Sequence, residues 1–308
     1  YAVADSAILA SLGLPTTPTV LTPEVMAARG PVAGTLATNL VSCDGTTYLA
    51  SGGVRHALTS GAAAAWGRAP TALTAVPCSR STVASGTFGT TLVDASGAVF
   101  RMLGGGRYLL QGASALAFRD GLPSVRADAA VLSQLPLRGT ITQAAGANTI
   151  VRTPNGTIAF FDGSTLLPFA SAAVASAFGG ASPTPVDATF ASLFSTGTTI
   201  ATPAVRCGTT VGLAVDGRLL PFASSAVQSA FRLSHVTMPT ALCASLQPGS
   251  AVTQYVSADG QTWLIENGQR RQLLTQRAID RLGAPLTGIT PVSSAVVALL
   301  PTGAAIER

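Results

Sequence analysis

The chain has 308 residues, of which 47% are hydrophobic and 10% are charged. This composition excludes an intrinsically disordered chain and a collagen-like one. The formal net charge is +5, but all the basic residues are arginines and they are scattered, with Arg270-Arg271 as the one adjacent pair. We therefore expect a compactly folded protein that does not bind nucleic acid.

Every apolar stretch is interrupted by Gly, Pro, Ser or Arg before it reaches the roughly eighteen residues that a membrane-spanning helix requires. We therefore expect no membrane span. The sequence begins at Tyr1 without a charged and then apolar leader. We expect that a signal peptide either has been removed or was never part of this chain.

An internal repeat is visible near the middle of the chain. Residues 167–178 and 220–231 nearly coincide, at an offset of 53 positions. Such a repeat has to be recognised first, because its period decides which fold the sequence can form. The period predicts small units that are stacked in tandem.

Three kinds of residue keep one register along the chain. The first is a glycine before a short apolar end, which we predict to form a turn: Gly34, Gly86, Gly139, Gly197, Gly249 and Gly303. The second is a glycine about nineteen residues further on: Gly53, Gly105, Gly163, Gly217 and Gly268. The third is a large apolar residue: Trp66, Phe118, Phe178, Phe231 and Leu282. We predict one domain, 1–308, of about six repeats with the bounds 1–38 (partial), 39–90, 91–143, 144–201, 202–253 and 254–308.

The chain begins in the middle of a repeat. Residues 1–12 align with the helical part of a later repeat, with Val3 at the position of Phe222 and Leu12 at that of Phe231. The sequence therefore has six helical segments but five hairpins. We expect either a sixth hairpin upstream of Tyr1 in a longer precursor, which we favour, or an array that is left open at one end.

Each complete repeat begins with a predicted hairpin, in which two short extended runs flank a tight turn with a glycine at positive φ. The turn dipeptides include Asp44-Gly45, Ser96-Gly97, Asn155-Gly156 and Asp259-Gly260. After the second landmark glycine, a stretch such as residues 224–231 has apolar residues at helical spacing behind a serine that can cap a helix. An extended piece with Pro, such as residues 289–292, follows. Each repeat is thus predicted as strand, strand, short helix and strand.

Neither a helix of two or three turns nor a small sheet can bury an apolar face alone. Neighbouring repeats must therefore supply the missing core. We predict an α+β repeat protein and favour a closed, propeller-like ring of about six blades, because closure buries every face. An open solenoid is the alternative.

Four cysteines occupy equivalent positions in two repeats. Cys43 and Cys207 precede the second landmark glycine by ten residues, and Cys78 and Cys243 follow it by 25 and 26 residues. This duplication predicts the disulfides Cys43–Cys78 and Cys207–Cys243, which imply an oxidising compartment. Four buried free thiols are the alternative. A metal site has less support, because no two cysteines have Cys-x-x-Cys spacing.

The sequence offers no recognisable catalytic site. His56 and His235 stand in no setting typical of acid–base catalysis, and no Gly-x-Ser-x-Gly motif is present. The acidic residues are single and mostly at turns, where Asp side chains hydrogen-bond their own backbone. Residues 155–157 match a glycosylation acceptor, but their place in a hairpin explains them. We therefore predict a protein that is not an enzyme and that has no cofactor and no metal site.

One polar feature recurs. An arginine follows the second landmark glycine by one or two residues in four repeats: Arg55, Arg107, Arg218 and Arg270. A guanidinium repeated in this way can bind an anionic wall polymer through charge-assisted hydrogen bonds, so these four are candidate ligand-binding residues. The stronger alternative is that the stem of each side chain covers apolar surface while its head pairs with a nearby acid or carbonyl.

The pattern of hairpin, Gly-x-Arg, Pro-Phe-Ala-Ser, helix and Leu-Pro-x-Gly resembles the surface repeats of secreted actinobacterial proteins, which are often attached to cell-wall amidases. It is also similar to the periplasmic repeats of the EccB subunit of type VII secretion systems. Residues 57–60 and 108–111 depart from the pattern, because they lack the Pro-Phe motif. The resemblance implies an extracellular or cell-envelope location and a binding or scaffolding role.

We accordingly predict a non-catalytic binding module of the cell surface that recognises cell-wall polysaccharide or another envelope component. The alternative is a structural subunit of a surface layer, filament or secretion assembly, whose partners are other copies of the chain. A third, weaker idea is the accessory part of an enzyme, in a larger parent chain whose catalytic domain lies outside residues 1–308.

Overall fold

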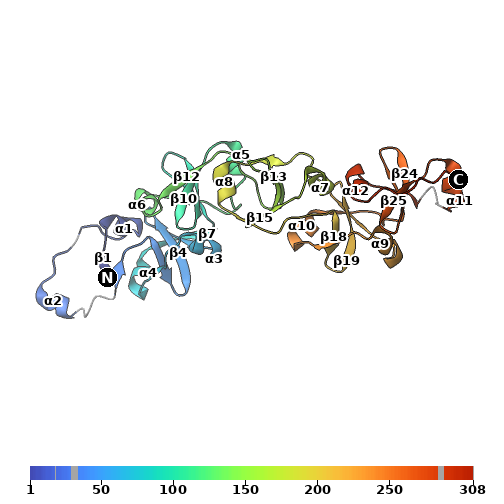
Figure 1. Ribbon diagram of the computed structural model, residues 1–308. Coiled ribbons are helices and arrows are strands. Elements are labelled where there is room, and N and C mark those ends of the chain that lie inside the picture. Colours follow the sequence, from blue (N-terminus) through green and yellow to red (C-terminus); the bar gives the residue numbers. More distant parts are fainter. Residues whose placement is uncertain (18, 29–33, 284–287, 308) are drawn as a thin grey trace. The chain divides into compact units, whose positions relative to one another are not determined.

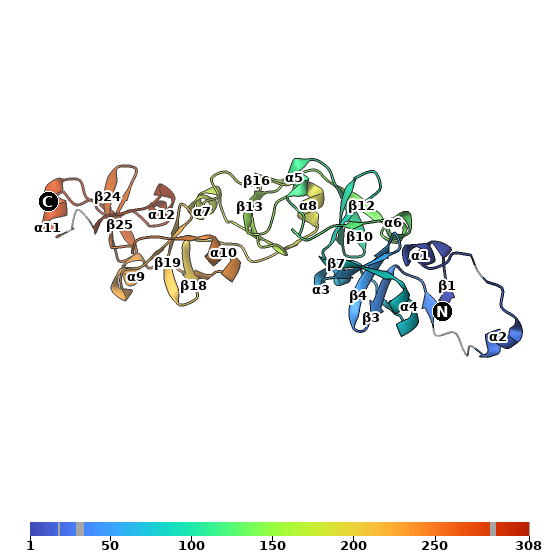
Figure 2. The same cartoon turned by 180° about the vertical axis from the view of Figure 1, so that it is seen from behind.

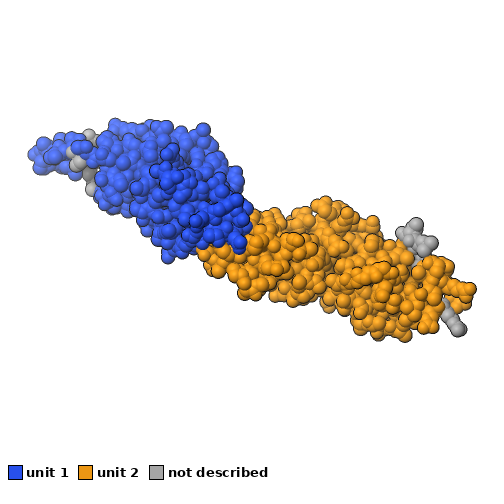
Figure 3. All heavy atoms as spheres, turned by 90° about the horizontal axis from the view of Figure 1, so that it is seen from above, with its two compact units in different colours: residues 1–144 blue, residues 145–308 orange. Residues whose placement is uncertain are grey.

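The computed structural model describes residues 1–17, 19–28, 34–283 and 288–307. They form two compact units, residues 1–144 and residues 145–308 (Figure 3). Both units are built from the same α+β element, a small mixed β-sheet with two short helices (Figure 1). No helix in the described ranges is long and apolar enough to cross a membrane.

Residues 40–88 of unit 1 show the element in full. Three antiparallel strands form a meander, and two edge strands run parallel to its first and third strands, in the order β6-β3-β4-β5-β7. The first helix follows the meander, and the second lies between the two edge strands. The bounds are β3 (Leu40–Cys43), β4 (Thr46–Ser51), β5 (Val54–Leu58), α3 (Ser60–Ala65), β6 (Thr71–Ala72), α4 (Ala75–Arg80) and β7 (Thr82–Phe88).

The other sheet of this type in unit 1 has the order β11-β8-β9-β10-β12. Its bounds are β8 (Thr91–Val93), β9 (Val99–Leu103), β10 (Gly106–Leu110), α5 (Ala113–Leu116), β11 (Val125–Arg126), α6 (Ala129–Gln134) and β12 (Leu137–Ile141). The N-terminal segment contains the second half of an element. It comprises β1 (Ala2–Val3), α1 (Ser6–Ser11), α2 (Pro23–Ala28) and β2 (Thr35–Leu36), with β1 parallel to β2.

Unit 2 contains three sheets. The first has the order β16-β13-β14-β15-β17 and is made by β13 (Thr149–Arg152), β14 (Ile158–Phe161), β15 (Thr165–Pro168), α7 (Ala172–Ala177), β16 (Thr184–Pro185), α8 (Ala188–Ser192) and β17 (Ser195–Thr196). The second has the order β21-β18-β19-β20-β22 and is made by β18 (Ala204–Cys207), β19 (Thr210–Val215), β20 (Arg218–Pro221), α9 (Ser225–Phe231), β21 (Val236–Thr237), α10 (Thr240–Ser245) and β22 (Gln247–Pro248).

The last sheet has the order β25-β24-β23-β26. It is made by β23 (Tyr255–Ala258), β24 (Gln261–Glu266), β25 (Gln269–Gln272), α11 (Gln276–Arg281), β26 (Thr290–Pro291) and α12 (Ser294–Ala298). Where the other sheets have a fifth strand, two isolated parallel bridges join Arg270 to Thr302 and Leu273 to Ile306. The same element is therefore present, with its last edge strand reduced to two contacts.

The first helices start where the sequence predicts. The side chain of Ser224 accepts a hydrogen bond from the backbone of Val227 and caps α9, and Asp5 caps α1 in the same way. The two caps stand at equivalent places in the alignment of residues 1–12. Short polar N-caps satisfy backbone N–H groups that a helix of one or two turns cannot satisfy itself.

The predicted order of strand, strand, helix and strand was incomplete. A third antiparallel strand follows the second landmark glycine, and a second helix precedes the last edge strand. Both were missed for a physical reason. The third strand is short and runs almost directly into the helix, and second helices of five or six residues are too short to display a helical period.

The first landmark glycines also differ from the prediction, which placed them in turns. Gly86 lies inside β7 and Gly139 inside β12. A Cβ atom on Gly197 would lie 2.5 Å from Cδ2 of Leu167, and one on Gly249 would lie 2.6 Å from Cδ1 of Leu220. At these two positions glycine lets the chain pass directly over a side chain of the third strand.

Adjacent sheets within each unit share their hydrophobic core, as small repeats require. In unit 1, Leu40, Leu49 and Trp66 belong to one buried cluster with Met102 and Val131 of the following sheet. Helices two elements apart also touch: α1 lies beside α6, and α7 beside α12 (Figures 1 and 2). In the predicted propeller-like ring, blades would pack against their immediate neighbours, whereas these helices contact each other across an intervening repeat. The described residues show no closed ring.

Candidate functional site

The second landmark glycines join one repeat to the next. In four of the five, the N–H of the glycine, in the turn before the third strand, donates to a backbone carbonyl at the end of the first helix of the preceding repeat. The four donor–acceptor pairs are Gly53–Ser11 (3.0 Å), Gly105–Ala65 (2.9 Å), Gly217–Ala177 (3.0 Å) and Gly268–Ala230 (2.8 Å). Each bond satisfies a carbonyl that a helix terminus leaves free. The register seen in the sequence is therefore the register of these junctions.

Asp128 ties three repeats of unit 1 together. One of its carboxylate oxygens accepts a hydrogen bond from the backbone of Val131 and caps α6. The other accepts from the hydroxyl of Ser11 at 2.6 Å and from the backbone N–H of Gly52 at 2.9 Å. This acid therefore has a structural role, with its oxygens engaged on both sides.

The structure contains both predicted disulfides. Cys43 is bonded to Cys78 with a Cα–Cα distance of 5.9 Å, and Cys207 to Cys243 with one of 5.6 Å. Each joins the end of the first meander strand to the second helix, so it closes this helix onto its sheet. The sequence placed the second cysteine of each pair in a last segment of the repeat, without recognising the helix.

Two of the candidate arginines, Arg55 and Arg107, point into the protein. Arg55 is 4% exposed and donates to the backbone carbonyls of Cys78 and Ser81, at the end of α4. Arg107 donates to the carbonyls of Leu132 and Leu135, at the end of α6. A guanidinium at a helix C-terminus satisfies free carbonyls and opposes the negative end of the helix dipole. These contacts agree with the alternative in which the head of each arginine pairs with nearby carbonyls rather than with a ligand.

The other two candidates are more accessible. Arg218 is exposed and lines an open pocket together with Asp216 and Ser250. Arg270 is half-buried, donates to the hydroxyl of Thr302 at 3.0 Å and stacks on the ring of Trp263, 5.2 Å from its centroid. Arg55, Arg107 and Arg270 therefore share a position in the repeat, whereas Arg218 stands one residue earlier, at the position of Val54. Ligand binding by the four arginines stays a prediction.

The buried titratable groups of unit 1 are held by structural contacts. Burial disfavours the charged form of Asp120, but hydrogen bonds from Thr90 and the nearby charge of Arg101 hold the pKa of this carboxyl below its usual value. Burial also lowers the pKa of His56, whose ring packs edge-on against Phe88 at a centroid distance of 4.7 Å. Neither group faces a partner with which it could carry out acid–base chemistry.

Metal ligands and the remaining histidine offer no further site in the described ranges. No group of three or more His, Cys, Asp or Glu side chains is placed so that it could hold a metal ion there. His235 is exposed, and its Nε2 lies 3.0 Å from a guanidinium nitrogen of Arg206.

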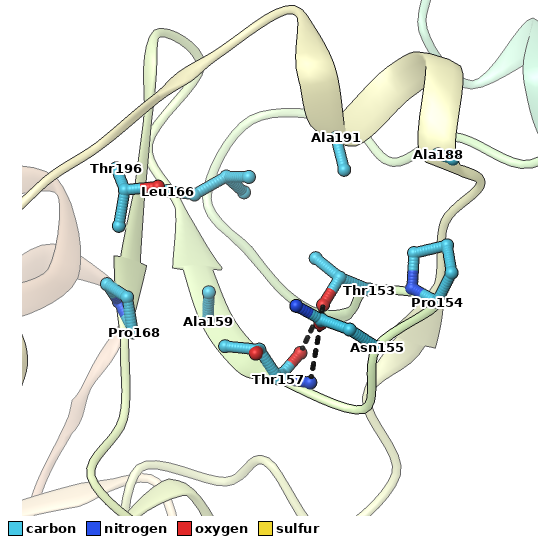
Figure 4. A pocket seen from close by; sticks show the side chains of 10 residues that line it. All are labelled: Thr153, Pro154, Asn155, Thr157, Ala159, Leu166, Pro168, Ala188, Ala191 and Thr196. Atoms are coloured by element: carbon cyan, nitrogen blue, oxygen red, sulfur yellow. Dashed lines mark hydrogen bonds between the residues drawn. The ribbon is translucent and has the colours of Figure 1, made fainter.

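The sheet of residues 149–196 carries a pocket of about 600 Å³ (Figure 4). Its polar lining comes mostly from the turn between β13 and β14, and helix α8 forms the opposite wall. The lining residues are Thr153, Pro154, Asn155, Thr157, Ala159, Leu166, Pro168, Ala188, Ala191 and Thr196. None of them is charged and six of the ten are apolar, so the pocket has a polar wall in a mostly apolar lining.

This pocket occupies the place that a disulfide fills in two other sheets. Thr153 directly follows the last residue of β13 that pairs with its edge strand, as Cys207 does in β18. Ala191 is the fourth residue after the N-cap of α8, as Cys243 is after the N-cap of α10. A threonine and an alanine thus replace a covalent bridge between strand and helix. Sequence reasoning missed this, because the second helix was not predicted.

The comparisons with known proteins were made for the whole chain. No family model and no curated protein matches it. Among solved structures, the chain is similar to one titled as the periplasmic assembly from the ESX-5 inner membrane complex, with 10% sequence identity, 91% of this chain and 97% of that chain covered, and a TM-score of 0.19. Another, from an intact ESX-5 inner membrane complex, has 12% identity, coverages of 92% and 82%, and a TM-score of 0.17. TM-scores this low carry no argument about function.

Proposed function

We propose that this chain is a non-catalytic structural subunit of an assembly outside the cytoplasm, such as a surface layer, a filament or a secretion complex. One observation carries the proposal: the residues that recur from repeat to repeat are used to build the protein. Four of the second landmark glycines bond to the preceding helix, and Arg55 and Arg107 bind helix carbonyls. Residues that recur for structural contacts favour a protein whose role is to present a stable surface, rather than one that carries a reactive group.

The location outside the cytoplasm is supported by the two disulfides. Disulfides form and persist in oxidising compartments and are rare in the reducing cytosol. Each of them closes a loop of 35 or 36 residues within a single repeat. The covalent closure of these two loops suits a protein that has to stay folded outside the cell.

Binding of a wall polymer is the second candidate, and Arg218 favours it. This arginine is exposed, and it lines an open pocket together with Asp216, Gly249 and Ser250. A guanidinium with free donors can bind a carboxylate or phosphate of an anionic polymer. In the proposed scaffold this pocket has no role, so the two functions make different predictions.

Self-association and wall binding can be measured on the same purified, disulfide-bonded chain. Light scattering over a hundredfold range of concentration measures the mass of the particles, and co-sedimentation with cell-wall sacculi measures retention. We expect oligomers that grow with concentration and no retention on sacculi. A monomer at every concentration that is retained on sacculi, and that loses retention in Arg218→Ala, would replace the structural proposal by the binding one.

A further inference from the structure

We propose that the pocket of residues 153–196 binds an uncharged, hydroxyl-bearing molecule of one or two sugar rings. A volume of about 600 Å³ lies within the range of small-molecule sites in proteins. The proposal goes beyond a structural role, which requires no ligand, and it assigns the pocket to carbohydrate chemistry.

The pocket is a departure from the repeat. The equivalent strand and helix positions carry Cys43 with Cys78, and Cys207 with Cys243. In the last sheet the corresponding residues are Ala258 and Val297, which belong to one buried core cluster. At three of the five sheets the space is thus closed by a bond or by apolar contact. Thr153 and Ala191 leave it open.

The pocket offers three polar groups to a ligand. Within the described residues, no hydrogen bond uses the amide nitrogen of Asn155 or the hydroxyls of Thr157 and Thr196. The amide donates, and each hydroxyl can both donate and accept. A ligand rich in hydroxyl groups can satisfy all three. A charged ligand would find no opposite charge among the ten lining side chains.

The polar wall of the pocket, formed by the turn between β13 and β14, is already ordered. Oδ1 of Asn155 accepts from the hydroxyl of Thr153 at 2.5 Å and from the backbone N–H of Thr157 at 3.1 Å, as the dashed lines in Figure 4 show. These bonds fix the amide plane, so Nδ2 is held without a bond of its own. A donor that is fixed before binding loses little conformational entropy when a ligand arrives.

The floor of the pocket is apolar. Ala159 and Leu166 are 1% and 5% exposed, and Pro168, on the same strand as Leu166, is paired with Ala159. A sugar ring has hydroxyls around its edge and C–H groups on its faces. Polar groups along one wall and apolar side chains below therefore match an uncharged sugar, and acetyl methyl groups would add to the apolar contact.

The test is a titration of the isotope-labelled chain with N,N′-diacetylchitobiose, an uncharged disaccharide, followed by NMR. We expect saturable shifts at the amides of Thr153, Asn155, Thr157 and Thr196. The oxidised variant Thr153→Cys/Ala191→Cys, which restores the bridge found in two other sheets, should bind at least about tenfold more weakly. Formation of the bridge is confirmed by mass spectrometry.

Two further variants keep the result interpretable. Ala191→Leu fills the pocket with the residue that α6 has at the same place, Leu132, and should also weaken binding. It provides the test if the cysteine variant fails to fold. Ala258→Cys/Val297→Cys adds a bridge in the last sheet and should leave the affinity unchanged. Any of three results would overturn the proposal: the absence of saturable shifts, bridged and filled variants that bind with the affinity of the wild type, or an anionic disaccharide that binds more tightly than the uncharged one. Self-association of the chain is unaffected by any of these outcomes.

Discussion

Gly67 lies directly against the backbone of Gly105 in the next repeat. A Cβ atom on Gly67 would stand 2.6 Å from Cα of Gly105, and Gly67 has a φ of +72° that L-residues rarely adopt. Beside this contact, the N–H of Gly105 donates to the carbonyl of Ala65 at 2.9 Å. Two glycines and one hydrogen bond thus set how closely these two repeats pack.

Gly67→Ala should therefore destabilise unit 1 by about 2 to 5 kcal/mol, through left-handed strain and a backbone clash together. Gly97→Ala is the matched control in the same unit, because Gly97 has a φ of +87° and open space around its would-be Cβ. The control should lose only the strain, about 1 to 2 kcal/mol. Urea denaturation measures both, and equal losses would show that the close approach is unimportant.

The landmark glycines show what the sequence could and could not reveal. Their spacing disclosed the repeat, because the second landmark glycines all have a positive φ, and this requirement recurs wherever the same turn recurs. It could not disclose that Gly53 and Gly105 bond to the repeat before them, since contacts between repeats leave no local pattern. Nor could it reveal helices such as α8 and α10, which have five and six residues.

Arg55 should be essential for stability although it is charged. It is 4% exposed, and its guanidinium donates to the carbonyls of Cys78 and Ser81. Arg55→Ala leaves these carbonyls without a donor and should lower the free energy of unfolding by about 2 to 4 kcal/mol. Arg218→Ala, at an exposed position one residue earlier in its repeat, should change it by no more than about 0.5 kcal/mol. Equal effects at the two sites would argue against the structural role of Arg55.

Each disulfide should stabilise the unit that contains it. Cys43→Ala/Cys78→Ala opens a loop of 35 residues, and on the chain-entropy model this should cost about 3 to 4 kcal/mol. Thermal unfolding of the variant, with and without reductant, measures the loss. Reductant should destabilise the wild type more than the variant, because the variant has one bridge left to lose. A variant as stable as the oxidised wild type would contradict this.

The pocket of unit 2 illustrates the limit of the sequence for the site. The cysteine pairs were readable because two copies of one spacing stand out. Thr153 and Ala191 are ordinary residues, and their equivalence to Cys207 and Cys243 appears once the strand pairing and the N-caps of α8 and α10 are known. A site created by the absence of a bridge leaves no motif.

The stability of unit 1 should depend on pH through His56. Burial lowers the pKa of this histidine below 6.5, and its Nδ1 is buried without a hydrogen-bond partner in the described structure. Below about pH 6.5 the unfolded chain takes up a proton that the folded chain still excludes, so the unfolded state gains stability. The contribution of neutral His56 is therefore complete above this pH and declines as the pH falls towards the lower, folded-state pKa.

His56→Leu isolates this effect, because Leu220 occupies the matching place in β20 and the variant keeps every carboxylate of the chain. Urea midpoints at pH 7.5 and pH 5.5 should fall further apart in the wild type than in His56→Leu. Carboxylates titrate mainly below this range, and they act equally in both proteins, so the difference between the two pH profiles reports His56 alone. Identical profiles would mean that the imidazole is charged in the folded unit as readily as in the unfolded chain, and that burial against Phe88 does not hold it neutral.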